Sequence, residues 1–244
     1  MLNKLYNKNR LAFAIVWIVA YCVLMSVGDV LSATLGVEKS VSFLMGLLLS
    51  AVLFVFLKTS GLTSAYGLCP SRASAREMVF YLPLVLLLTA NLWFGVRMNV
   101  STFETILYIL AMFCVGFLEE VIFRGLLFEA MRKNSERAAI LVSSLTFGIG
   151  HIINLINGSG AELVPNLRQV VYATAAGFLF VMIYCHTQSL IVPIVTHGLF
   201  NALSVFAAPP PTLLWRVISC LLLTVITGSY AIYLALLRKY VKRN

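Results

Sequence analysis

Residues 113–128 read FCVGFLEEVIFRGLLF, an apolar run that carries three charged residues within six positions. The run belongs to a longer hydrophobic segment, Phe103 to Leu127, which as a helix is long enough to cross the roughly 30 Å hydrocarbon core of a bilayer. An ionisable side chain at the centre of a membrane helix costs at least ~2.5 kcal/mol, so such residues are usually functional. The stretch therefore predicts a membrane-spanning fold with a polar site inside it.

The composition of the whole chain extends this membrane assignment. Of the 244 residues, 61% are hydrophobic and only 11% are charged, which excludes a soluble domain around one buried core. The apolar runs lack the alternating pattern of barrel strands, so we expect an all-α, polytopic integral membrane helical bundle that forms one membrane domain over residues 1–244. The eight expected transmembrane helices are Leu11 to Ala33, Val41 to Leu57, Met78 to Phe94, Phe103 to Leu127, Ala138 to Leu155, Gln169 to Cys185, Leu190 to Phe206 and Leu213 to Leu237.

The basic residues are divided unevenly between the two ends of these spans. Thirteen of the eighteen Lys and Arg residues fall on the side of the termini, four fall on the other side, and Arg124 lies within a span. The positive-inside rule then places both termini in the cytoplasm. This asymmetry explains the formal net charge of +9, so no nucleic-acid partner is expected. The first apolar run is longer than that of a cleaved signal peptide and lacks a cleavage site, so we expect it to remain as a span.

The three charges of the opening stretch are not equivalent. On an α-helix, residues four apart share a face, so Glu120 and Arg124 are expected to neutralise each other. Glu119 is turned about 100° from Glu120 and therefore has no partner on its own helix. A buried ion pair that only fixes helix packing would explain Glu120 and Arg124, whereas Glu119 needs a polar cavity to face.

Two further spans carry polar residues at helical spacing. Phe147 and His151 lie four apart in LTFGIGHIINL, and His197 and Asn201 lie four apart in PIVTHGLFNAL. Each pair alone is compatible with hydrogen bonds between helices rather than with chemistry. Counted from the cytoplasmic span ends, the two histidines, the asparagine and Glu119 all lie roughly 10 to 20 Å deep, in one slab of the membrane. We therefore expect them around one cavity that is open toward the cytoplasmic side.

These polar residues resemble the motifs of the CPBP (Abi) family of intramembrane proteases, which includes the type II CAAX prenyl proteases and the bacterial bacteriocin-processing and immunity proteins. The family's motifs are two glutamates with an arginine after three intervening residues, then phenylalanine with histidine four residues on, then histidine with asparagine four residues on. The matching residues are Glu119, Glu120 and Arg124, then Phe147 and His151, then His197 and Asn201. The resemblance covers roughly residues 103–206, and the motifs occur in the family's order.

The resemblance implies hydrolysis of a peptide bond within the membrane. Glu119 and His151 would activate a water molecule, and His197 and Asn201 would stabilise the oxyanion. The supporting residues would be Glu120, Arg124 and Phe147. This chemistry is sensible on independent grounds, because a carboxylate hydrogen-bonded to a water can act as a general base and donors directed at the oxyanion lower the barrier. The expected substrate is a membrane-embedded or lipidated peptide.

A metal-dependent mechanism is the alternative chemistry. Glu119, His151 and His197 are the ligand types of a two-histidine, one-carboxylate zinc site with an open position for water. The H-E-x-x-H motif that usually builds such a site is absent, and the five cysteines form no C-x-x-C pair. We therefore expect no required cofactor, with zinc at these three residues as the alternative.

Two other classes of function fit the same helices. A non-catalytic membrane immunity or regulatory protein would use them to bind another membrane protein. A proton-coupled transporter is a third alternative, although no duplicated halves or broken helices are visible. In each case we expect a multi-pass protein of a bacterial cell membrane whose partners are the lipid bilayer and membrane-associated peptides or proteins.

Overall fold

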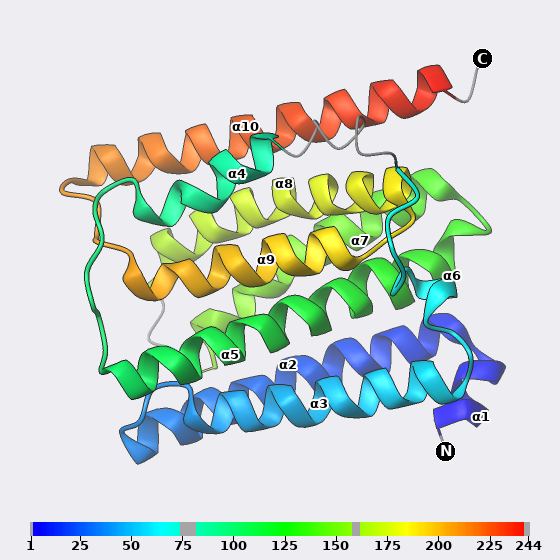
Figure 1. The fold of residues 1–244 in the computed structure, drawn as a ribbon, viewed down its shortest axis with the longest axis horizontal. Coiled ribbons are helices and arrows are strands. Elements are labelled where there is room, and N and C mark those ends of the chain that lie inside the picture. The colour runs from blue at the N-terminus through cyan, green and yellow to red at the C-terminus, as the bar shows by residue number, and fades with distance from the viewer. Residues whose placement is uncertain (1, 74–81, 158–161, 242–244) are drawn as a thin grey trace.

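The fold is a bundle of helices that run side by side along the long axis of the molecule (Figure 1). The computed structural model describes residues 2–73, 82–157 and 162–241. Within these ranges there is no strand, and the only extended pairing is an isolated bridge between Val96 and Ala207. The expected all-α helical bundle is therefore confirmed.

The helices keep the order of the expected spans, with short helical turns between or after them. The α-helices are α1 (Leu2–Lys8), α2 (Arg10–Leu35), α3 (Ser40–Thr59), α4 (Leu82–Leu88), α5 (Thr102–Glu119), α6 (Phe128–Arg132), α7 (Glu136–Gly150), α8 (Leu163–Thr187), α9 (Ile191–Leu203) and α10 (Leu213–Val241). The 3₁₀-helices are η1 (Ser64–Tyr66), η3 (Thr89–Leu92), η5 (His151–Leu155) and η6 (Ser204–Phe206), and η4 (Glu120–Leu127) is a π-helix.

Six helical segments of the described chain are long and apolar enough to cross a membrane. They correspond to six of the eight expected spans. The other two expected spans are represented by shorter apolar helices, Pro83–Leu92 and Ile191–Phe206. The start of the expected third span, residues 78–81, lies outside the described residues. The polytopic bundle is thus confirmed, and eight crossings stay a prediction.

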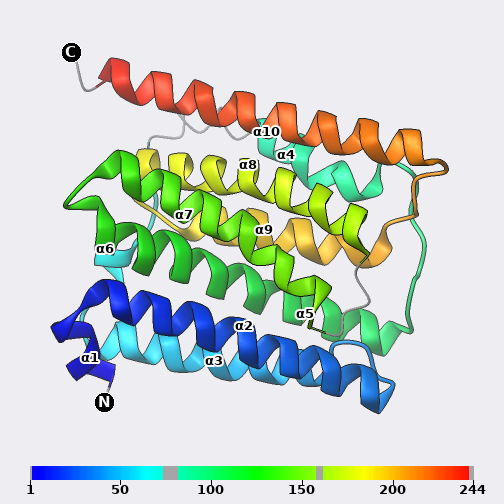
Figure 2. The same ribbon diagram turned by 180° about the vertical axis from the view of Figure 1, so that it is seen from behind.

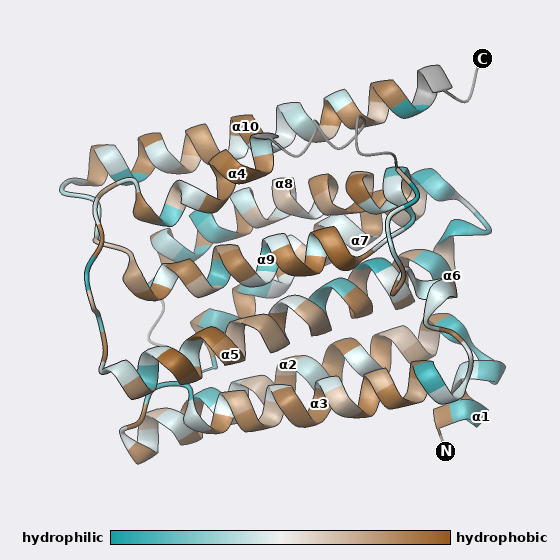
Figure 3. Cartoon of the chain, in the orientation of Figure 1, coloured by the Kyte–Doolittle hydropathy of each residue, from teal (hydrophilic) through white to brown (hydrophobic). Residues whose placement is uncertain are grey.

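The outward faces of the bundle are apolar. Val19 on α2, Leu44 on α3 and Leu221 on α10 leave 56%, 60% and 58% of their surface exposed. Figure 3 shows hydrophobic residues along the helices and hydrophilic residues gathered near their ends. Monomeric soluble proteins rarely expose continuous apolar surface of this extent. The chain is therefore a multi-pass integral membrane protein.

The first and last helices show that both termini lie at one end of the bundle (Figures 1 and 2). We call this the terminus end, where α1 begins and α10 ends. The opposite end is the hairpin end, where Gly36 closes α2 in the left-handed conformation (φ 68°) before α3 begins. Helix α5 also begins at the hairpin end, where Ser101 and Glu104 form a capping box. The cytoplasmic location of the terminus end stays a prediction.

Two close approaches between helices bring the polar spans together. A Cβ atom on Gly116 would lie 2.8 Å from the backbone nitrogen of Gly198, so α5 and α9 touch nearly backbone to backbone. A Cβ atom on Gly148 would likewise lie 2.8 Å from the Cα of Thr174, at the contact of α7 with α8. Because glycine has no side chain, α5, α7, α8 and α9 converge around the residues predicted to form the site.

Candidate active site

The buried ion pair predicted from helical spacing is present. Arg124 Nη1 donates to Glu120 Oε1 at 3.1 Å, and both side chains are fully buried. The pair sits on the π-helix η4, which continues α5 without a break and is buried along its whole length. Single turns of π-helix occur mostly inside α-helices and often at functional sites. The wider turn therefore marks the position in the bundle where the charged residues are held.

The guanidinium of Arg124 also lies against two aromatic rings. Its Cζ is 4.0 Å from the ring centroid of Phe147 and 5.5 Å from that of Phe180. Nε and Nη2 of Arg124 and Oε2 of Glu120 have no hydrogen-bond partner. Leaving such groups unsatisfied is costly, and cation–π contacts offset part of that cost. Arg124 thus joins η4 to α7 through Phe147 and to α8 through Phe180.

His197 lies between the two glutamates. Its Nδ1 is 2.9 Å from Glu120 Oε1, and its Nε2 is 3.4 Å from Glu119 Oε2. The imidazole stacks on Phe180 at 5.5 Å between centroids and meets the edge of Phe147 at 5.6 Å. Because Glu120 accepts from Nδ1–H, the ring is held in one orientation and only Nε2 is left to act elsewhere. Helical spacing alone could not reveal this contact, because α9 and η4 are distant in sequence.

Glu119 has a partner that the sequence did not predict. The Tyr21 hydroxyl of α2 donates to Glu119 Oε1 at 2.6 Å. The expectation that Glu119 has no partner on its own helix holds, but the carboxylate is not left alone, because Tyr21 is 98 positions away in the chain. No motif marks Tyr21, so only the packing of α2 against η4 could have identified it.

His151 lies where α7 changes into the 3₁₀-helix η5. Its Nδ1 is 3.0 Å from the carbonyl oxygen of Phe147. A carbonyl oxygen can only accept, so Nδ1 carries the proton and Nε2 of a neutral ring keeps its lone pair. Asn166 of α8 donates to the His151 carbonyl at 2.8 Å and so holds the end of α7 in place. Asn166 is a second supporting residue that the sequence did not indicate.

The Phe147 ring contacts both histidines. Its centroid is 5.3 Å from that of His151 and 5.6 Å from that of His197, so the imidazoles are no farther apart than the sum of these distances. The three polar spans therefore meet within a small volume, as their shared depth predicted.

The polar residues line two cavities rather than the single one that we expected. The histidine cavity, of about 70 Å³, is lined by His151, His197 and Asn201, among others. The glutamate cavity, of about 110 Å³, is lined by Glu119, Tyr21 and again His151. Phe147 and His151 line both cavities, and their rings separate the two spaces. Each volume is enough for water molecules, which need roughly 10 to 15 Å³ on this measure.

The comparisons with known proteins concern this part of the chain. Residues 101–203 match the family described as type II CAAX prenyl endopeptidase Rce1-like. This segment is similar to the Rce1-like family. All seven motif residues lie within it, whereas Tyr21 and the rest of α2 lie outside it.

One curated relative is also similar to part of this chain. The Bacillus subtilis (strain 168) protein named "Putative membrane peptidase YdiL" is 34% identical to this chain over 95 residues. The aligned part is 38% of this chain and 34% of that relative, so the match spans about a third of YdiL. No solved structure matches the chain. The Rce1-like assignment therefore rests on the motif-bearing helices, and the chemical roles of their residues stay predictions.

The zinc alternative concerns three residues of the Rce1-like segment. In the described part of the chain, no group of three His, Cys, Asp or Glu side chains is arranged to hold a metal ion. Glu119 and His197 are in contact, at 3.4 Å between Oε2 and Nε2, and Phe147 contacts both histidine rings. Whether a metal ion is required stays a prediction.

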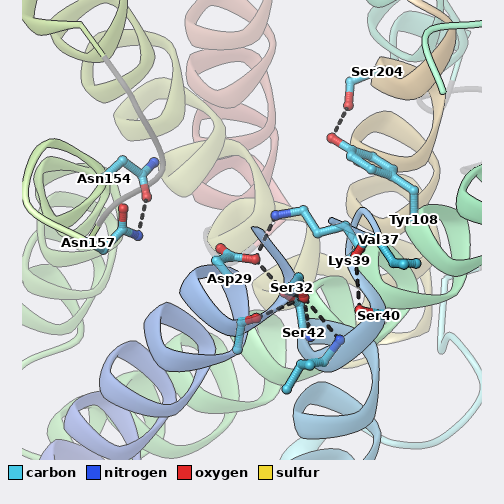
Figure 4. Close-up of polar contacts among 12 residues, drawn as sticks. Asp29, Ser32, Val37, Lys39, Ser40, Ser42, Tyr108, Asn154, Asn157 and Ser204 are labelled. Carbon is cyan, nitrogen blue, oxygen red and sulfur yellow. Dashed lines mark hydrogen bonds and ion pairs between the residues drawn. The ribbon is translucent and has the colours of Figure 1, made fainter. Parts of the chain in front are cut away.

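The glutamate cavity extends from the Rce1-like segment toward the hairpin end. Its outer lining includes Asp29 of α2 and Lys39, which form an ion pair at 2.7 Å (Figure 4). Ser42 of α3 also donates to Asp29. These residues are at the end of the bundle opposite the termini. The lining thus reaches toward the end of the bundle opposite the termini, and the side on which the cavity opens stays a prediction.

Proposed function

We propose that the protein is an intramembrane endopeptidase that hydrolyses a peptide bond of a membrane-associated or lipidated peptide. The observation that supports this most directly is the position of His197 between two carboxylates, 2.9 Å from Glu120 and 3.4 Å from Glu119, beside a second histidine and two water-sized cavities. A structural ion pair alone would need neither Glu119 nor His151. The similarity of residues 101–203 to the Rce1-like family supports the same class of reaction.

The reaction consumes one water molecule and begins with its activation. Glu119 and His151 both line the glutamate cavity, so a water there can bond to the Glu119 carboxylate and to the free Nε2 of His151. As the water oxygen attacks the carbonyl carbon, Glu119 takes one proton. Glu119 then passes this proton to the free Nε2 of His151, and His151 donates it to the leaving nitrogen as the C–N bond breaks, which returns Glu119 to the carboxylate and His151 to the neutral ring. Tyr21 holds the Glu119 carboxylate toward this cavity.

His197 and Asn201 are proposed to stabilise the oxyanion. Both line the histidine cavity, which shares Phe147 and His151 with the glutamate cavity. Glu120 accepts from Nδ1 of His197, so the imidazole can donate to an oxyanion only through a proton on Nε2. Donors held in place before the reaction need no reorganisation when charge develops, which is why they are effective.

Hydrolysis is proposed to need no metal ion, because the water contacts above use only protein groups. The measurement is peptide cleavage by purified protein after exhaustive chelation. Unchanged cleavage supports the proposal. Cleavage that chelation abolishes and stoichiometric zinc restores would assign Glu119, His151 and His197 to the metal instead.

The substrate must widen the site in order to reach it. The two cavities have volumes of about 70 and 110 Å³, below the roughly 300 to 1,000 Å³ of pockets that enclose drug-sized ligands. An extended peptide therefore fits only after side chains or helices move apart. We place the protein in a bacterial cell membrane, because the relative YdiL is from Bacillus subtilis.

The test compares membrane-peptide fragments from cells that carry the wild type, Glu119→Gln or Glu38→Gln. Glu38 is exposed in the α2–α3 connection and lines neither cavity, so its variant is the matched control. We expect fragments with the wild type and with Glu38→Gln, and none with Glu119→Gln at equal membrane abundance. A cellular effect that persists in Glu119→Gln without any difference in fragments would point to a non-catalytic regulatory protein.

A further inference from the structure

A third cavity, of about 350 Å³, lies next to the candidate active site and contains two arginines. We call it the arginine cavity and define it by Arg168, Arg216, Trp93 and Phe94. Arg168 is on α8 and Arg216 on α10, and both helices begin at the hairpin end of the bundle (Figures 1 and 2). The reaction proposed above uses neither residue.

The arginines of this cavity lack a counter-charge. No Asp or Glu occurs among the described residues that line it, and neither arginine forms an ion pair within residues 2–73, 82–157 and 162–241. Nη1 of Arg168 is buried and has no hydrogen-bond partner among the residues that the structure describes. A buried guanidinium N–H without an acceptor is costly, so an anion in the cavity would satisfy it.

The positions of the arginines in their helices add to this positive potential. Arg168 is the sixth residue of α8 and Arg216 the fourth of α10, so each lies within roughly 8 Å of the start of its helix. Helix N-termini carry partial positive charge and favour bound anions. Two side-chain cations and two helix starts thus face one small volume.

The surroundings of the cavity match the interfacial region of a bilayer. Trp93 and Phe94 line the cavity, and the Phe94 ring meets the Trp215 ring at 6.2 Å between centroids. Trp and Tyr are enriched at membrane–water interfaces. Leu213 and Leu214, at the start of α10, leave 65% and 66% of their surface exposed. The anion that meets these arginines at the edge of a hydrocarbon core, and is always present there, is the headgroup phosphate of a lipid.

We propose that the arginine cavity binds the phosphate of a phospholipid headgroup in the leaflet at the hairpin end. Arg168 and Arg216 hold the phosphate oxygens, and the glycerol and acyl chains lie against the aromatic residues and the exposed leucines. Tyr172, Phe200 and Leu223 line both this cavity and the histidine cavity. The bound lipid therefore covers the wall behind Asn201 and keeps bulk water from the histidine cavity on that side.

The experiment measures lipid rather than cleavage, so its result is independent of the proposed hydrolysis. The full chain is purified in mild detergent, and retained phospholipid per chain is counted by native mass spectrometry. The double variant Arg168→Gln/Arg216→Gln is compared with Arg97→Gln. Arg97 is exposed near the same end, bonds to Asn99 and does not line the cavity. We expect about tenfold or greater loss of lipid affinity in the double variant, because charge-assisted bonds are lost, and wild-type affinity in Arg97→Gln.

Further arms separate the sources of the anion. Delipidated protein is titrated with short-chain phosphatidylglycerol, inorganic phosphate and a hexapeptide with a free C-terminal carboxylate. Saturable binding of the lipid that equimolar phosphate does not displace supports the proposal. Displacement by phosphate, or binding of the peptide alone, would overturn it, as would unchanged lipid retention in the double variant. Arg168→Lys is the control for misfolding, because it keeps the positive charge but loses the forked geometry of the guanidinium. We expect its affinity for the lipid to lie between those of the wild type and the double variant.

Discussion

At the scale of single residues, Glu119 and Glu120 are neighbours in sequence but hold different partners. Glu120 is fully buried and contacts the side chains of Arg124 and His197. Glu119 contacts Tyr21 and, at 3.4 Å, also His197, and it lines a cavity. Glu120 thus holds η4 and α9 together, whereas Glu119 has room for a water molecule beside it.

Replacing each glutamate by glutamine should separate these two roles. Glu120→Gln leaves Arg124 without its buried counter-ion, and breaking one side of such a pair typically costs about 3 to 5 kcal/mol. We therefore expect Glu120→Gln to accumulate poorly in membranes. Glu119→Gln keeps the shape and the Arg124 pair, so it should accumulate normally but lose about 10²- to 10⁴-fold in cleavage rate. Quantitative blots of membrane fractions, paired with cleavage rates, make the comparison. A stable, inactive Glu120→Gln beside an active Glu119→Gln would reverse the assignment.

Tyr21 is predicted to position Glu119, although it lies outside the Rce1-like segment. Tyr21→Phe removes one hydroxyl and its 2.6 Å bond to the carboxylate, a charge-assisted bond worth about 1.5 to 3 kcal/mol. We expect kcat to fall about tenfold or more with KM unchanged, because Tyr21 does not act on the substrate. Tyr6→Phe, which removes the buried 2.8 Å bond to Tyr66, is the control. Equal kcat values for the two variants would show that Tyr21 has no positioning role.

At the scale of helices, the site depends on how closely α5 and α9 approach. Gly116→Ala would place a methyl group 2.8 Å from the Gly198 nitrogen, a backbone atom that cannot turn aside. We expect α9 to be displaced, which would move His197 from the two glutamates, reduce cleavage and lower the unfolding temperature. Gly228→Ala is the control, because no atom lies within 4 Å of its Cβ position on α10. Replacing a helical glycine by alanine there should raise stability by about 0.5 to 1 kcal/mol.

If Gly116→Ala kept full cleavage activity and an unchanged unfolding temperature, the prediction would be wrong. The helices α5 and α9 would then be able to adjust to the added methyl group. Thermal unfolding in detergent and cleavage rates of both glycine variants decide between these outcomes.

The helical scale also explains what the sequence could and could not predict. Contacts within one helix follow from its period, so the Glu120–Arg124 pair was predictable even though η4 is a π-helix. Contacts between helices depend on packing, so neither the Tyr21–Glu119 bond nor the Glu120–His197 contact could be found from spacing. The division of the site into two cavities likewise depends on where the Phe147 ring points, which the sequence does not determine.

At the scale of the whole molecule, hydropathy was enough to predict a polytopic bundle, because apolar runs of span length leave few other folds. The number of membrane crossings was harder to predict from hydropathy. Residues 191–206 form a helix shorter than a typical span, and residues 83–92 form a still shorter one. Their place in the bundle is set by packing, of α9 mainly against α5 and of α4 against α9 and α10, and hydropathy alone does not predict such packing.

The direction from which the glutamate cavity is reached is the last prediction, and it combines topology with structure. The positive-inside rule puts the terminus end in the cytoplasm, whereas Asp29 and Lys39 line the cavity at the hairpin end. In a variant without the five native cysteines, Ser26→Cys, which lines this cavity, should react with a membrane-impermeant thiol reagent added from the non-cytoplasmic side. Lys58→Cys, exposed at the terminus end of α3, should react only from the cytoplasmic side.

Labelling of right-side-out and inverted vesicles distinguishes the possible arrangements. Reaction of both cysteines from the cytoplasmic side would mean that the cavity opens beside the termini, as the motif depths alone suggested. Reaction of each cysteine from the opposite side to that expected would mean that the bundle is inverted and the basic asymmetry misleading. Reaction from opposite sides in the expected sense would instead show that water and a peptide meet Glu119 from the non-cytoplasmic side of the membrane. That direction favours substrates presented at the outer leaflet over those tethered inside the cell.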